Sequence, residues 1–155
     1  MVLVLRTSCI FVLLTLIACS SNIARHNYLV AGDVSKQYFQ HLFLNENYTV
    51  AYEMMHGNFK KKFSQAQLEE LLIKTHDGSI PKQFEIMEYE IYSGQEFISV
   101  FINTKNQNPN YFYRVTLTGT KDKGYLIAGF HISTSQIAAE GKRLPYDPII
   151  AISEV

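Results

Sequence analysis

Cysteine and tryptophan are the residues that this chain has least of. Its 155 residues include two cysteines and no tryptophan. The cysteines are Cys9 and Cys19, so the chain after residue 19 has no disulfide bond to stabilise it and no thiol to act as a nucleophile. Basic and acidic side chains number 14 each, without the basic excess that is typical of nucleic-acid-binding proteins. We therefore expect stability from packing alone, and no nucleic acid as a partner.

The chain also lacks the spacings that mark common catalytic and metal sites. It has no glycine-rich phosphate loop and no Ser–His–Asp arrangement that can be placed. The five histidines do not form the short His-x-x-x-His spacing of a helical metal site; they are His26, His41, His56, His76 and His131. The sequence thus predicts no metal, no cofactor and no catalytic set. It favours a non-enzymatic function and leaves an enzyme as the alternative.

The start of the chain has the pattern of an export signal. Met1–Arg6 carries one positive side chain, and Ile10–Ala18 is almost wholly apolar. A charged start before about 7–15 apolar residues is typical of a secretory signal and is too short to span a bilayer. We expect residues 1–18 to be removed and residues 19–32, which show no periodicity, to form a tether.

The end of this signal, Leu16-Ile17-Ala18-Cys19, resembles the lipobox of bacterial lipoproteins. The resemblance implies cleavage before Cys19 and attachment of acyl chains such as palmitate to Cys19, which makes the lipid bilayer a partner. By the sorting rule of that family, Ser20 implies the outer membrane of a Gram-negative cell, with the domain facing the periplasm. The alternative is an ordinary secretory signal in which Cys19 has no role.

Helical spacing of apolar residues predicts three helices after the tether. The first is expected to begin with Asp33 as its N-cap, and the second to cover Tyr48–His56. The third has the clearest start, a capping box with Ser64 at the N-cap and Gln67 at the third helical position. It is expected to end near Asp77. Its inward stripe is expected to be Leu68, Leu71, Leu72 and Thr75.

From Gln83 onward the apolar period changes to two, which predicts four strands. They are expected near residues 83–91, 97–103, 111–118 and 125–134, each antiparallel to the last. The fourth is apolar on much of both faces, which predicts a central strand, and Gly129 is expected to mark a bend. The predicted fold class is α+β, with three N-terminal helices packed on one face of a curved four-stranded antiparallel sheet.

The last of these strands, Gly124-Tyr125-Leu126-Ile127-Ala128-Gly129-Phe130-His131-Ile132, closes a pattern that resembles the nuclear transport factor 2-like fold, or cystatin-like cone. Asn45–Met55 is similar to the entry to the second helix in small lipoproteins of this type. The resemblance implies a domain over residues 33–135, with an apolar pocket at the open end of the cone. Members include isomerases, dehydratases, small-ligand binders, dimeric adaptors and secretion-machine components, so the fold does not give the function.

A ligand in the cone would be expected to meet strand residues with aromatic or titratable side chains. Those residues are Tyr89, Phe101, Tyr113 and His131. His131 could sense pH or bind the ligand, and the alternative is an exposed strand histidine. An isomerase would also need an inward carboxylate. Glu88 and Glu90 alternate with apolar neighbours, which predicts that both lie on an outward, solvated face.

Residues 136–155 change character and are predicted to form a C-terminal tail. The stretch Lys142–Pro148 is polar and broken by prolines, whereas Ile149–Ile152 is apolar. An apolar run of this kind should be covered. It is expected either to add a strand or clasp to its own domain or to dock on a partner.

Together these patterns predict a membrane-anchored periplasmic lipoprotein that acts as a non-enzymatic binding or assembly module. An envelope protein is the expected partner, and a homodimer is compatible with this reading. One alternative is a small apolar ligand carrier, or an isomerase- or dehydratase-like enzyme, that uses the cone pocket. Another is a periplasmic component of a secretion apparatus. A cone filled by its own side chains would favour the module over the carrier or enzyme.

Overall fold

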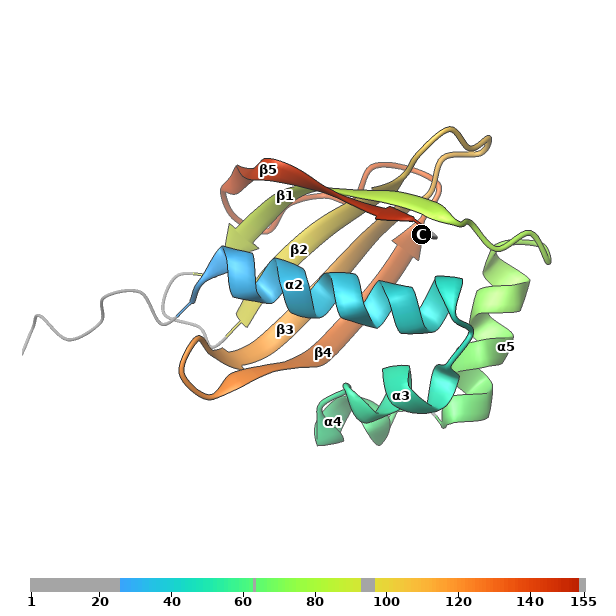
Figure 1. The fold of residues 1–155 in the computed structure, drawn as a ribbon, viewed down its shortest axis with the longest axis horizontal. Coiled ribbons are helices and arrows are strands. Elements are labelled where there is room, and N and C mark those ends of the chain that lie inside the picture. Colours follow the sequence, from blue (N-terminus) through green and yellow to red (C-terminus); the bar gives the residue numbers. More distant parts are fainter. Residues whose placement is uncertain (1–25, 63, 93–96, 154–155) are drawn as a thin grey trace, which may run out of the picture.

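The computed structural model describes residues 26–62, 64–92 and 97–153 (Figure 1). Helices come first in this part of the chain: α2 (Tyr28–Phe39), the π-helical segment η1 (Gln40–Leu44), α3 (Tyr48–Glu53), α4 (Gly57–Lys60) and α5 (Gln65–Thr75). Five strands follow: β1 (Gln83–Ile91), β2 (Phe97–Thr104), β3 (Phe112–Thr120), β4 (Gly124–Ser133) and β5 (Arg143–Ser153). The predicted signal and Cys19 lie outside the described residues, so lipidation stays a prediction.

The strands form one antiparallel sheet in the order β4-β3-β2-β1-β5. Helix α2 lies across one face of this sheet, and the shorter helices gather at one end of the same side (Figure 1). We call this helix-covered side the inner face and the opposite side the outer face. Strand alternation then decides which side chains enter the core, since successive residues point to opposite faces.

The predicted fold class is wrong in its element count, because the described chain has four α-helices and five strands. The additional helix, α4, follows directly after the predicted end of the second one at His56. The additional strand, β5, comes from the segment predicted to be a tail, and it pairs with β1 rather than with the preceding β4. Pro145 and Pro148 interrupt its strand pattern, and proline is tolerated there because β5 is an edge strand.

Strand β4 is also an edge strand, so the prediction of a central strand is wrong. Its pairing with β3 shifts register between Thr116 and Leu117, which leaves Ala128 as the extra residue of a bulge beside the predicted bend at Gly129. A bulge reverses which alternate residues face inward. The residues packed on the core are accordingly Tyr125, Ile127, Phe130 and Ile132. The apparently two-sided apolar pattern is therefore one buried face interrupted by a bulge.

Helix α2 begins earlier than the sequence pattern predicts. Its N-cap is Asn27 rather than Asp33, and the Asn27 side chain accepts hydrogen bonds from the backbone N–H groups of Leu29 and Val30. The Tyr125 hydroxyl in β4 accepts a further hydrogen bond from the Asn27 N–H at 2.9 Å. Gly32 is a poor helix former, so the sequence pattern does not indicate that a helical turn precedes it.

Helix α5 confirms the predicted capping box. The Ser64 hydroxyl accepts from the Gln67 N–H at 3.3 Å, and the Gln67 side chain accepts from the Ser64 N–H at 2.8 Å. Leu68 and Leu72 are buried as predicted, whereas Leu71 is exposed and its predicted inward position is wrong.

Replacing Ser64 with alanine is expected to lower the free energy of unfolding by about 1 kcal/mol, because the Gln67 N–H loses its acceptor. Urea denaturation followed by circular dichroism measures this. Ser79→Ala is the matched control, because Ser79 is exposed and lies beyond the end of α5. Equal denaturation midpoints for the two variants would contradict the energetic role of the cap.

Candidate functional site

The inner face of the sheet is filled by the chain's own aromatic side chains. Phe39 of α2 lies at the centre, with its ring centroid 4.9 Å from Phe43, 5.1 Å from Phe84 and 5.2 Å from Tyr113. All four of these side chains are completely or almost completely buried. Rings at these separations are in packing contact, so this part of the predicted cone is core rather than ligand pocket.

A buried histidine–tyrosine pair lies at the edge of this core. His76, the C-cap of α5, is 2% exposed, and its Nδ1 lies 2.8 Å from the Leu72 carbonyl oxygen. Because a carbonyl only accepts, Nδ1 carries the proton, and Nε2 of the neutral ring accepts from the Tyr113 hydroxyl at 2.8 Å. Burial lowers the pKa of His76 below its ordinary value and raises the pKa of Tyr113. The pair therefore favours the neutral imidazole.

The free energy of unfolding is expected to fall as the pH drops below about 6.5, the ordinary pKa of histidine. In that range the unfolded chain protonates His76 while the folded chain keeps it neutral, since its folded pKa is lowered. Above that range the contribution is fully present. Urea denaturation at a series of pH values should show a shallower dependence for His76→Gln.

His131→Gln is the matched control for this pH series. His131 is exposed, so its removal should leave the dependence as in the unaltered protein. A His76→Gln variant with an unchanged pH dependence would show that this imidazole does not carry the effect.

The structure does not bring the four predicted ligand residues together. Tyr113 is in the inner core, and Tyr89 stacks on Tyr28 of α2 with ring centroids 4.6 Å apart. Phe101 lies on the outer face, beneath the Arg143 guanidinium at 3.7 Å, and His131 is exposed on β4. Phe101 and Tyr113 both line a small pocket of about 20 Å³, whereas Tyr89 and His131 do not line it. The role of the four residues in ligand binding stays a prediction.

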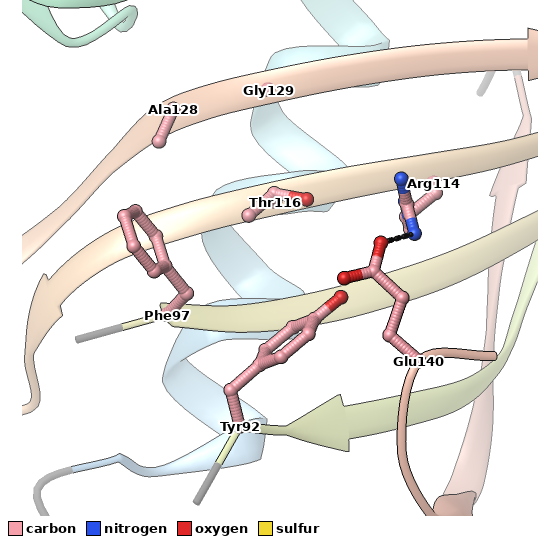
Figure 2. Close-up of a pocket in the computed structure, with 7 residues that line it drawn as sticks. All are labelled: Tyr92, Phe97, Arg114, Thr116, Ala128, Gly129 and Glu140. Atoms are coloured by element: carbon pink, nitrogen blue, oxygen red, sulfur yellow. Dashed lines mark hydrogen bonds and ion pairs between the residues drawn. The ribbon is translucent and has the colours of Figure 1, made fainter. Parts of the chain in front are cut away.

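A hollow of about 290 Å³ opens on the outer face (Figure 2). It is lined by Tyr92, Phe97, Arg114, Thr116, Ala128, Gly129 and Glu140. Figure 2 shows the rings of Tyr92 and Phe97 and the Arg114–Glu140 ion pair, which has an N–O distance of 2.6 Å. A side chain at position 129 would meet Thr116, with the added Cβ 3.3 Å from the Thr116 Cβ, so glycine keeps this wall open. We call this site the outer-face hollow.

The connection between β4 and β5 helps to build this site. Since β4 and β5 lie at opposite edges of the sheet, residues 134–142 must cross it, and they do so over the outer face. We call this segment the strap. It is held by Glu140, which pairs with Arg114 of β3, and by the Ile137 carbonyl, which accepts a hydrogen bond from Arg143 of β5.

Glu90 of β1 lies under the strap. It points outward as predicted, yet it is completely buried, so the prediction that it is solvated is wrong. Gly141 of the strap covers it so closely that a Cβ there would be 2.7 Å from the Glu90 Oε1. Neither carboxylate oxygen has a hydrogen-bond partner among the described residues. The burial was missed because no sequence pattern shows where a distant loop crosses a sheet.

The fold and the hollow define an α+β domain with helices on one face of a five-stranded antiparallel sheet and a strap on the other. Comparison with known proteins found no matching family model, no matching curated protein and no matching solved structure. The resemblances to lipoproteins and to the nuclear transport factor 2-like fold therefore stay predictions. Among the described residues, none of the helices has the length and apolar character needed to cross a membrane, and no cluster of potential metal ligands occurs.

Proposed function

We propose that this protein is an exported lipoprotein, anchored through Cys19, whose domain acts as a non-enzymatic binding or assembly module on the periplasmic side of the outer membrane. The observation that carries the proposal is the contrast between the two faces of the sheet. The inner face is packed with aromatic rings, whereas the outer face offers an open hollow with apolar, hydroxyl and charged groups. This contrast favours the outer face as the binding surface over a carrier or enzyme that uses the cone.

The expected anchor keeps this surface near the membrane. Asn27, the N-cap of α2, is only eight positions after Cys19, and an extended chain of eight such steps reaches at most about 26–29 Å. A lipidated domain on such a tether samples the volume next to the bilayer. This favours an envelope component as the partner, including the alternative of a secretion apparatus.

Cys19→Ala tests the anchor. The variant is expected to lose palmitate labelling and to leave the membrane fraction, because stable anchoring requires the acyl chains. Cys9→Ala is the matched control, since Cys9 lies in the segment expected to be removed, and it should keep both properties. Continued membrane retention of Cys19→Ala would overturn the anchor.

Photo-crosslinking in intact cells tests the binding surface. A photoreactive residue at Phe97, in the outer-face hollow, is expected to form a discrete adduct with an envelope component. The same residue at Leu71, exposed on α5 at the helical side, is the control and should form none. Adducts from Leu71 alone would move the binding surface to the helices. A small molecule that co-purifies without any protein adduct would favour the carrier.

A further inference from the structure

A polar row crosses the outer face at the level of the hollow. Glu90 of β1 is the Cα partner of Ser99 in β2, Ser99 is that of Thr116 in β3, and Thr116 is that of Gly129 in β4. The Ser99 hydroxyl lies 3.0 Å from that of Thr116 and 3.4 Å from that of Tyr92. No hydrogen bond joins these hydroxyls to the Glu90 carboxylate, whose two oxygens have no donor among the described residues.

A completely buried carboxylate with no donor lowers the stability of the folded chain, because it loses its hydration without gaining hydrogen bonds or an ion pair. Glu90 is 0% exposed. It lies beside the hollow. Tyr92, two residues further along the chain, and Glu140, next to Gly141, both line the hollow, and a Cβ added to Gly141 would be 2.7 Å from the Glu90 Oε1. The Glu90 carboxylate, beside the outer-face hollow, therefore lacks the hydrogen-bond donor or cation that would stabilise it.

The nearby arginines do not supply this partner for Glu90. Arg114 is paired with Glu140 at 2.6 Å, and Arg143 is paired with Glu88 at 2.9 Å. Each of these cations already has a carboxylate, and Lys142 of the strap is exposed whereas Glu90 is completely buried, so Glu90 has no paired cation among the described residues. The site is thus complementary to a monocation.

The remaining groups of the hollow suit a cation that carries a short apolar part. Tyr92 and Phe97 present aromatic rings, and such rings attract organic cations as well as apolar groups. A volume of about 290 Å³ is about ten times the ~30 Å³ that one water takes in the liquid. A small alkylammonium ion fits within that space.

We propose that the outer-face hollow binds an organic ammonium ion, with Glu90 as its counter-ion and the rings of Tyr92 and Phe97 against its apolar part. This deepens the proposed function and rests on it for the use of the outer face. The ligand reaches Glu90 by displacing Glu140 and Gly141 of the strap. The Arg114–Glu140 pair offers little resistance, because the Glu140 side chain is 59% exposed and such pairs contribute little.

Titration calorimetry on the purified lipoprotein in non-ionic detergent, with n-butylammonium as the probe, tests the proposal. Butylammonium is expected to bind and to raise the melting temperature, whereas 1-butanol and butyrate, which lack the positive charge, are not. Glu90→Gln keeps the shape of the side chain and should weaken butylammonium binding at least tenfold. Phe97→Leu keeps an apolar side chain without the ring and should weaken it several-fold.

Glu85→Gln is the matched control, because Glu85 lies on the same face of β1 but is already paired with Lys105 at 2.6 Å. Its affinity should equal that of the unaltered protein. Absence of butylammonium binding, equal binding of 1-butanol, or unchanged affinity in folded Glu90→Gln would each overturn the ammonium site. These failures leave a crosslink at Phe97 intact, so they are distinguishable from failure of the binding module.

Discussion

Replacing Phe39 with alanine is expected to lower the free energy of unfolding by about 3–5 kcal/mol. Phe39 is completely buried, and its ring contacts those of Phe43, Phe84 and Tyr113. The truncation removes apolar contact area and leaves a cavity that neighbouring rings, fixed by both helix and sheet, cannot close. Urea denaturation followed by far-ultraviolet circular dichroism measures the loss.

Phe97→Ala is the matched control for this experiment. Phe97 has the same side chain but is 37% exposed on the outer face, so its truncation should cost about 1 kcal/mol or less. A loss for Phe39→Ala no larger than that for Phe97→Ala would show that the inner face is not a rigid core. The contrast between the two faces would then be absent, and the outer face would no longer be favoured as the binding surface.

Gly32→Ala is expected to destabilise the protein by about 1–3 kcal/mol, although the same change inside a helix ordinarily stabilises by roughly 0.5–1 kcal/mol. A Cβ at position 32 would lie 1.8 Å from the Tyr146 hydroxyl oxygen. Tyr146 is 2% exposed, and its hydroxyl donates to the Tyr28 carbonyl at 3.1 Å, so it has little freedom to move. Thermal and urea denaturation would both report the loss.

Gly57→Ala is the control, because no atom lies within 4 Å of the Cβ that it adds. It should be neutral or slightly stabilising. Combining Gly32→Ala with Tyr146→Ala should cost less than the sum of the two changes, since the clash disappears when the ring is absent. Simple additivity would mean that β5 does not pack on α2 as the structure has it.

The sequence predicted the elements whose signals are local. The capping box at Ser64 is an example, because a helix start is specified within four residues. The hairpin of β3 and β4 is another, because its two strands are joined by a short turn and pair antiparallel as predicted. The bulge at Ala128 is not local in this sense, since it depends on how β4 pairs with β3.

The parts that could not be predicted depend on contacts between distant segments. Strand β5 pairs with β1, and this places the strap over the outer face. Local alternation showed correctly that Glu90 points outward, but its burial comes from Gly141 of the strap. The outer-face hollow combines residues of β2, β3, β4 and the strap with Tyr92 at the end of β1. No local pattern brings these residues together.

The pairing of the last strand with the first has a consequence for the order of folding. The Tyr146 hydroxyl and the Tyr28 carbonyl that it bonds are 118 residues apart in the chain. Contacts of such long sequence separation form slowly, because a large loop must close before they contribute. Helix α2 and the β3–β4 hairpin can form first, whereas we expect β5 to dock late and to draw the strap over Glu90. Because Glu140 of the strap lines the outer-face hollow, the hollow has its full lining only after β5 has paired with β1.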